Sequence, residues 1–293
     1  MAQTAPRSIR IPQFGLLALA ALLTAIYFAV ISHAGDTAHL GMSGLFYLAA
    51  ASLVWDKRQS LPNQTSLQGI VLGSLLLILT LALSAYLLQL DFAVVKVAKS
   101  KTTLTGLRLL PFLSGLALAA LAAGVRGFRL FWRELVILFF LGAPSVVAAF
   151  VTDISPATAR FSTFLLWYSG FDVMRQGLVI ALPGGGVEVY YGCSGMESIT
   201  YLLGLSAVCL VMFPISGIKR WLTPFIAIAI GFFINAIRVA LMAVLAASEN
   251  KAAFDYWHEG DGSLLFGLVA VLFFGGLYML ILQREPANPP QKL

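Results

Sequence analysis

Cys193 has a reactive side chain, and the residues around it suggest that it acts as a nucleophile. It lies in the segment YGCSGMES (residues 191–198), which leads directly into an apolar run. Ser194 and Glu197 have the S-x-x-E spacing of a capping box, so we expect Ser194 to be the N-cap of a helix. The positive end of that helix would favour the thiolate, the nucleophilic form of cysteine. The alternative is a small buried cysteine, as we expect for Cys209 in the middle of the next apolar run.

Arg238 is a charge inside an otherwise apolar run. Asn235 precedes it by three residues and so shares its face on a helix. Counted from the end of the run at Ala247, Arg238 lies about 13 Å deep, at roughly 1.5 Å per residue. A charge within a membrane helix is costly and indicates a function. The alternatives are an arginine that reaches the interface or one that pairs with a carboxylate for packing.

His258 lies in the segment DYWHEGDG (residues 255–262), just before the last apolar run, and it is the only histidine of the second half. A thiol, a base that can take its proton and a fixed cation are what cysteine acyl transfer requires. The acidic residues of the segment lack EF-hand spacing, so we expect a hydrated turn. One histidine and one outer cysteine are too few ligands for a metal, and we expect no cofactor. His33 and His39, in the first outer loop, we expect to be solvated.

The composition requires that these residues be positioned by membrane helices. Apolar residues make up 59% of the 293 and charged residues only 11%, against roughly 25% charged in a soluble domain. This excludes a soluble enzyme, a disordered chain and a nucleic-acid binder. We expect an all-α polytopic membrane protein with about eight transmembrane helices. The apolar runs are Phe14–Ile31, Gly41–Trp55, Gly69–Leu90, Leu109–Val125, Leu135–Val151, Glu197–Ile215, Leu222–Ala247 and Ser263–Leu282.

Two smaller elements precede Cys193. The segment Ala157–Phe171 carries Arg160 and is typical of an amphipathic helix that lies in the membrane interface. The segment GLVIALPGGGVEVYY (residues 177–191) has two alternating runs around a turn signal, which predicts a small extracytoplasmic β-hairpin. No repeat or long linker divides the chain. We therefore expect one integral membrane domain over 1–293, with N-terminal helices in 1–151 and a catalytic half in 152–293.

Basic residues of the short loops predict the orientation of the helices. Eight crossings place five groups of basic residues on one side, which would be cytoplasmic, and Cys193, Arg238 and His258 at or near the other face. One outer loop, with Lys96, Lys99, Lys101 and Arg108, opposes this model. The five groups are Arg7 and Arg10; Lys57 and Arg58; Arg126, Arg129 and Arg133; Lys219 and Arg220; and Arg284 and Lys292.

The three motifs together resemble those of the exosortase/archaeosortase family. The resemblance rests on the CSG of residues 193–195 at the start of a helix, the NAIRV of 235–239 in the next helix, and His258 followed by Gly260 and Gly262 before the last. It covers the C-terminal half well and the first half only as a hydrophobic pattern.

The resemblance also assigns roles and a subfamily. The family's catalytic Cys, Arg and His carry over to Cys193, Arg238 and His258. The pair Met196 and Glu197 after the CSG motif departs from the less acidic continuation of the family pattern and would mark a subfamily. The Gly-rich hairpin suggests a cyanobacterial-type exosortase.

The family implies a cysteine peptidase or transpeptidase in the inner (plasma) membrane of a prokaryote. Such enzymes cleave the C-terminal sorting signal of exported proteins, which consists of a short motif (Pro-Glu-Pro in many exosortase substrates), a transmembrane helix and a basic tail. The product passes through a thioester to an envelope acceptor. The implied partners are these membrane-anchored proteins and the lipid bilayer, with no nucleic acid.

We expect Cys193 to attack the scissile carbonyl, His258 to carry the proton, and Arg238 to stabilise the oxyanion or to hold the thiolate and substrate in place. Asn235 would orient Arg238, and Ser194 and Glu197 would cap the helix below Cys193.

Two other functions fit a polytopic chain. In a transporter, Arg238 would be a charge that binds the substrate. That function predicts paired broken helices in two related halves, which the sequence does not show. The chain could also be a non-catalytic component of envelope polysaccharide export.

Overall fold

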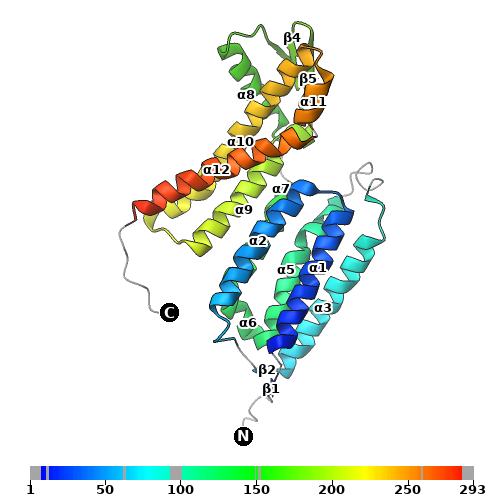
Figure 1. Ribbon diagram of the computed structural model, residues 1–293, viewed down its shortest axis with the longest axis vertical. Helices are drawn as coiled ribbons and strands as arrows, with labels where there is room; N and C mark the ends of the chain where they lie inside the picture. The colour runs from blue at the N-terminus through cyan, green and yellow to red at the C-terminus, as the bar shows by residue number, and fades with distance from the viewer. Residues whose placement is uncertain are drawn as a thin grey trace. The chain divides into compact units, whose positions relative to one another are not determined.

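The computed structural model describes residues 8–10, 13–61, 64–92, 101–148, 150, 153–258 and 260–285. Within these ranges the chain is mainly helical, which confirms the prediction of an all-α polytopic membrane protein. It divides into two compact units, Met1–Ala149 and Phe150–Leu293 (Figure 1). This boundary lies close to the division that the sequence suggests after residue 151.

All eight predicted membrane segments are helices, but fewer of them are long enough to span. Six are long and apolar enough to cross a membrane. The other two have 17 residues each, or about 25 Å of helix against a hydrocarbon core of about 30 Å. The eight helices are α1 (Gln13–His33), α2 (Thr37–Asp56), α3 (Leu67–Leu88), α5 (Lys101–Ala123), α7 (Trp132–Ala148), α9 (Met196–Met212), α10 (Gly217–Ala247) and α12 (Asp261–Gln283).

The two short helices, α7 and α9, have local reasons for their length. We expected the apolar run of α9 to continue to Ile215, but Pro214 removes a backbone donor and ends the helix at Met212. The first turn of α7 carries Arg133 and Glu134, and Glu134 is buried in an ion pair with Lys57 at 2.9 Å. The polar start of α7 therefore has a partner inside the protein.

The first unit consists of α1, α2, α3, α5 and α7 with the short helix α6 (Val125–Leu130). The strands β1 (Ser8–Arg10) and β2 (Gln64–Ser66) pair antiparallel near its N-terminus. Glycines allow its helices to approach closely. A Cβ at Gly69 of α3 would lie 2.5 Å from the Cα of Gly124, and one at Gly73 would lie 2.6 Å from Cγ of Leu121. Gly142 of α7 lies against the carbonyl oxygen of Arg108 in α5 in the same way.

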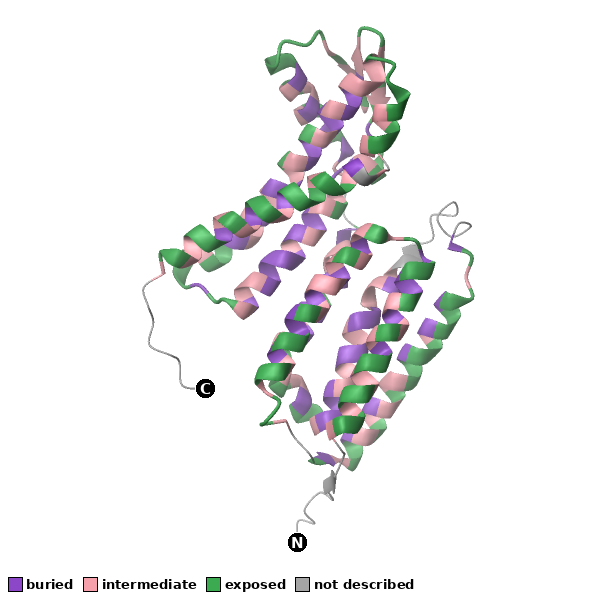
Figure 2. Cartoon of the chain, viewed as in Figure 1, coloured by how far each residue is buried: buried purple, intermediate pink, exposed green. Residues whose placement is uncertain are grey.

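The outer faces of the helices expose large apolar side chains, as a membrane helix requires. Leu75, Ile78 and Leu79 of α3 are each more than half exposed, as are Leu272 and Phe273 of α12. Figure 2 shows exposed positions along the outer helices of each unit. Patches of this kind are unusual on soluble monomers and are expected where lipid is the solvent.

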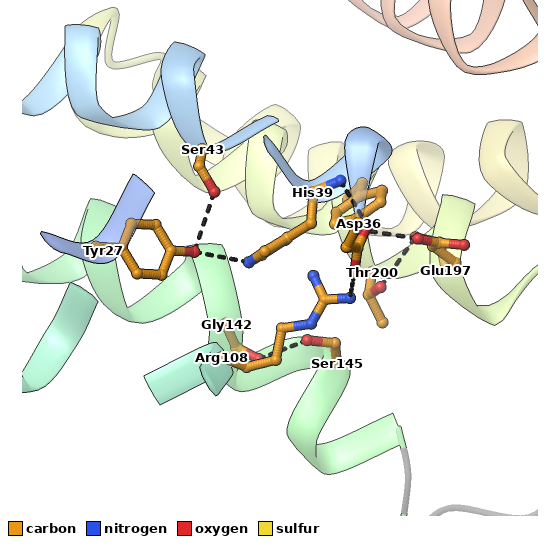
Figure 3. Close-up of polar contacts among 10 residues, drawn as sticks. Tyr27, Asp36, His39, Ser43, Arg108, Gly142, Ser145, Glu197 and Thr200 are labelled. Carbon is orange, nitrogen blue, oxygen red and sulfur yellow. Dashed lines mark hydrogen bonds and ion pairs between the residues drawn. The ribbon is translucent and has the colours of Figure 1, made fainter. Parts of the chain in front are cut away.

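A polar network crosses the interior of the first unit (Figure 3). The hydroxyl of Tyr27 lies 2.8 Å from Nε2 of His39 and 3.1 Å from Oγ of Ser43. Asp36 caps the start of α2 by accepting from the backbone N–H of His39, and it pairs with Arg108 at 2.8 Å. The expectation that His39 is solvated is therefore wrong, because its side chain is fully buried among polar partners. His33 is exposed, as expected.

The second unit begins with α8 (Ser155–Tyr168) and a three-stranded antiparallel sheet of order β3-β4-β5. The predicted hairpin is confirmed as β4 (Val179–Leu182) and β5 (Gly185–Glu188), with Ile180 opposite Val187. A third strand that the sequence patterns did not predict, β3 (Met174–Gln176), pairs with β4. A helix is present in the predicted amphipathic segment, and its place in the membrane interface stays a prediction.

The remaining helices of the second unit are α9, α10, α12 and the short α11 (Lys251–His258). α8, β4, β5 and α11 gather around one end of α10 (Figure 1). At the other end, Lys219 pairs with Glu285 at 2.8 Å, and the hydroxyl of Ser216 donates to the same carboxylate at 2.6 Å. These bonds join the start of α10 to the residues after α12.

The glycine contact between α5 and α7 gives a test of the packing of the first unit. Gly142→Ala should lower the unfolding temperature in detergent, because the new methyl group would meet the rigid backbone of Arg108. Overpacking of this kind costs about 1–3 kcal/mol. The control is Gly44→Ala in α2, where a Cβ meets nothing within 4 Å. Equal unfolding temperatures for the two variants would contradict this packing.

Candidate active site

The small sheet positions Cys193. The chain leaves β5 at Val189, whose N–H donates to the carbonyl of Leu178 at 3.0 Å. It then forms the 3-10 turn η1 (Tyr191–Cys193). Val189 and Ile180 are buried in a core cluster with residues of α8 and α10, and Cys193 packs against this cluster. The sheet thus holds the Cys193 turn against the end of the unit where α10 finishes.

The start of α9 differs from the predicted capping box. The N-cap is Gly195, which adopts a left-handed conformation with φ of 92° and makes no side-chain cap bond. Ser194 instead accepts a hydrogen bond from the N–H of Met196 at 3.3 Å. With the N-cap at Gly195, Glu197 lies at the second helical position rather than the third. It cannot close the box, and its carboxylate accepts from the hydroxyl of Tyr201 at 3.0 Å.

His258 faces the thiol of Cys193. The distance from Sγ of Cys193 to Nε2 of His258 is 3.6 Å, within hydrogen-bonding range for sulfur. The imidazole stacks on the ring of Phe254, with centroids 5.1 Å apart, and meets the edge of Tyr190 at 6.5 Å. These rings hold the imidazole in place beside the thiol.

Residues 255–258 of the segment that carries His258 are the end of α11, and not part of the hydrated turn that we expected. Asp255 lies within α11 and pairs with Lys251 at 2.8 Å. Glu259 lies outside the described residues, and Asp261 begins α12. The i,i+4 pair and the apolar residues between its members favour the helix over a turn.

Arg238 contacts the backbone of His258. Its Nη2 donates to the carbonyl oxygen of His258 at 2.6 Å. Within the described part of the chain, its Nε is buried and has no hydrogen-bond partner. α11 has 8 residues and spans about 12 Å, close to the depth of about 13 Å of Arg238 below the end of α10. α11 therefore runs back far enough to bring its last residue, His258, level with the guanidinium of Arg238. The guanidinium then satisfies one of the C-terminal carbonyl groups of α11.

Asn235 holds the nucleophile rather than the arginine. Its Nδ2 donates to the carbonyl oxygen of Cys193 at 2.9 Å. The expected role of orienting Arg238 has no hydrogen bond to support it among the described residues. Asn235 and Arg238 share a face of α10, as predicted. Asn235 binds the turn that carries Cys193, and Arg238 binds the end of α11, which carries His258.

Two hydroxyl groups of α8 that we did not predict from the sequence also bind this part of the protein. The Oγ1 of Thr158 donates to the carbonyl of Ser194 at 2.6 Å, and the Oγ of Ser162 donates to the carbonyl of Ala236 at 2.8 Å. Both side chains are fully buried. The signal was a row of small polar residues on the buried face of an amphipathic helix, where apolar residues are usual.

The geometry supports proton transfer from a thiol to an imidazole. The backbone beside each group is held by a side-chain donor, so neither group depends on solvent for its position. Tyr191 adjoins the site, and burial, with a smaller contribution from Asp153, raises the pKa of its hydroxyl. It therefore stays a neutral phenol near pH 7. Among the described residues, no group of three His, Cys, Asp or Glu side chains could hold a metal ion.

The family model for the transmembrane exosortase, EpsH, matches residues 31–275. This range covers most of the chain and includes Cys193, Arg238 and His258. No curated protein and no solved structure matches the chain.

The conformation of Gly195 gives a test of the site. Gly195→Ala should lower the unfolding temperature in detergent for two reasons: its φ is positive, and its Cβ would lie 2.7 Å from Nδ2 of Asn235. The control is Gly170→Ala, with φ of 86° and nothing within 4 Å of its Cβ. Backbone strain of about 1–2 kcal/mol is common to both variants. The additional decrease in unfolding temperature for Gly195→Ala measures the contact with Asn235. Equal decreases for the two variants would contradict that contact.

Proposed function

Since the chain belongs to the transmembrane exosortase family, we propose that it is a membrane cysteine transpeptidase. Its substrates would be exported proteins that end in a short motif, a transmembrane helix and a basic tail. It would cleave the chain near the motif and pass the upstream part to an envelope acceptor through a thioester. The observation that carries this proposal is the 3.6 Å separation of Cys193 Sγ and His258 Nε2.

In the first step, Nε2 of His258 takes the thiol proton of Cys193. The thiolate then attacks the scissile carbonyl carbon, and the carbonyl π electrons move onto oxygen. General-base assistance by a positioned histidine is typically worth about 10²- to 10⁴-fold in rate. The neighbouring rings of Phe254 and Tyr190 restrict the imidazole to one position, which reduces the entropy lost on reaching the transition state.

Arg238 has two tasks in this scheme. One of its five N–H donors binds the carbonyl of His258 and so fixes the end of α11, which carries the base. A guanidinium presents its other donors in a fixed plane. One of these would bind the developing oxyanion, a contact generally worth about 2.7–4 kcal/mol. A lysine could not perform both tasks with the same geometry, because its charge is a single point on a flexible stem.

The tetrahedral intermediate then collapses and the C–N bond breaks. The leaving amine takes the proton from the His258 imidazolium, and the upstream part of the substrate remains as a thioester on Cys193. An acceptor amine, or water, gives a proton to His258 and attacks the thioester carbonyl. The C–S bond breaks, and Cys193 regains a proton from the imidazolium.

The ends of α10 support an external active site. Cys193 and His258 lie beside the second half of α10, at Asn235 and Arg238, where α9 and α12 begin. The start of α10 carries Lys219 and Arg220, and Arg284 follows α12 at the same end. Short loops that carry many basic residues generally lie on the cytoplasmic side of the membrane. The reactive end would therefore face outward, where an exported substrate emerges.

The nucleophile can be tested with the two cysteines of the chain. Cys193→Ala should abolish processing of a tagged exported protein that carries a Pro-Glu-Pro motif, a transmembrane helix and a basic tail. Cys209→Ala should process it normally, since Cys209 lies within α9 and away from the Cys193 turn. The measurement is the ratio of cleaved to full-length substrate on immunoblots of membranes with matched enzyme levels. Normal cleavage by Cys193→Ala would disprove the mechanism.

The thioester can be tested separately by trapping. Hydroxylamine added to membranes that hold enzyme and the same tagged substrate should release the upstream product as a hydroxamate, which mass spectrometry detects as a C-terminal mass change. The reason is that hydroxylamine attacks thioesters readily at neutral pH. Cys193→Ala membranes should yield no hydroxamate. Cleavage without hydroxamate in the native enzyme would indicate direct hydrolysis and contradict the acyl-enzyme.

A further inference from the structure

Two consecutive carbonyl groups of the Cys193 turn are bound by side chains from two different helices. Asn235 of α10 donates to the carbonyl of Cys193 at 2.9 Å, and Thr158 of α8 donates to that of Ser194 at 2.6 Å. Thr158 and Ser194 are fully buried, and Asn235 is 3% exposed. The bond to the Ser194 carbonyl is therefore buried, where water does not compete for the oxygen, and the bond to the Cys193 carbonyl is partly buried.

Neither carbonyl has a place in regular secondary structure. The first backbone bond of α9 is donated by Ile199 to the carbonyl of Gly195, one residue beyond Ser194. The turn bonds of Cys193 and Ser194 use their N–H groups, which donate to Tyr190 and Tyr191. An unpaired buried carbonyl is costly, so the side-chain donors fix which way the two peptide planes point.

The position of this backbone decides where the thiol lies. The Cβ of Cys193 is fixed by the backbone N, Cα and carbonyl C atoms of the residue, and the bound carbonyl groups hold these atoms in place. If this stretch of backbone shifts, Sγ moves relative to Nε2 of His258, and a contact of 3.6 Å leaves little room for movement.

We propose that Thr158 is a positioning residue for Cys193. With Asn235, it clamps the two peptide planes after the nucleophile and keeps the thiol within reach of His258. The inference rests on the proposed function only in that it requires His258 to assist the thiol. It assigns α8 a role in the reactive centre that extends beyond packing.

Ser162 gives a matched comparison. It lies one turn further along α8, it is also fully buried, and its hydroxyl also donates to a carbonyl of another element. Its acceptor is Ala236, in the middle of α10, and not the Cys193 turn. Substitution of either residue should lower the stability of the protein, but only substitution of Thr158 should change the reactivity of the Cys193 thiol.

The test needs no substrate. In a Cys209→Ala background, Cys193 is the only cysteine, and its alkylation by iodoacetamide in proteoliposomes reports how available the thiolate is. Thr158→Val, which keeps the shape and removes the hydroxyl, should slow alkylation at pH 7 about fivefold to tenfold. Thr158→Ser should restore the rate, and Ser162→Ala should leave it within about twofold. If Thr158→Val does not fold, Thr158→Ala replaces it.

A double-mutant comparison separates positioning from general damage. In a His258→Gln background, alkylation should already be slow, and Thr158→Val should slow it no further. Native rates for Thr158→Val, equal slowing in both backgrounds, or equal slowing by Ser162→Ala would each overturn the inference. If His258→Gln leaves the rate unchanged, the proposed role of the base fails, and the inference fails with it. Slowing by His258→Gln without slowing by Thr158→Val overturns the inference alone.

Discussion

The contact between Cys193 and His258 joins residues 65 positions apart, and the rest of the second unit serves to maintain it. One face of α10 sets the separation of the two groups. Asn235 binds the turn that carries the thiol, and Arg238 binds the end of α11, which carries the imidazole. Because residues three apart on a helix are fixed relative to each other, these two segments share one rigid reference. The i,i+3 spacing of Asn235 and Arg238 therefore sets the distance between the nucleophile and the base, and it also places the charge of Arg238.

The free-energy cost of placing Arg238 within a membrane helix explains the path of the chain around it. A guanidinium within a membrane helix requires acceptors, which lipid does not supply. α11 supplies one by running back along α10 until the carbonyl of its last residue, His258, meets Nη2. A helix that ends beside a cation is stabilised by its dipole, so the same contact stabilises α11, satisfies Arg238 and places the imidazole. A substitution at Arg238 would disturb all three together, which is why its effect alone cannot separate oxyanion binding from the positioning of His258.

The elements that depend on long apolar runs or on strong local signals were predicted correctly from the sequence. Hydropathy located all eight helices, and the turn signal around Pro183–Gly186 located the hairpin. The juxtaposition of Cys193 and His258 was expected from the order of the helix ends alone. Features decided by tertiary contacts were missed. The S-x-x-E pattern did not reveal that Gly195 would take the N-cap. The buried partners of His39 lie on other turns of the chain, and the acceptors of Thr158 and Ser162 lie 36 and 74 residues away. No local pattern encodes such partners.

The charge of Arg108 bears on the orientation of the chain. Four basic residues near the start of α5 opposed the eight-crossing model, but Arg108 lies inside α5 and pairs with Asp36, with only 14% of its side chain exposed. The rule that relates basic residues to the cytoplasm concerns charges in short loops, which interact with the membrane potential and lipid headgroups. A cation neutralised inside a helical bundle contributes little to that interaction. Arg108 therefore drops out of the orientation count because Asp36 neutralises it, and Arg238 drops out because it lies within α10 rather than in a loop. Within the second unit, Lys219 and Arg220 near the start of α10 and Arg284 after α12 lie at the end opposite the proposed site.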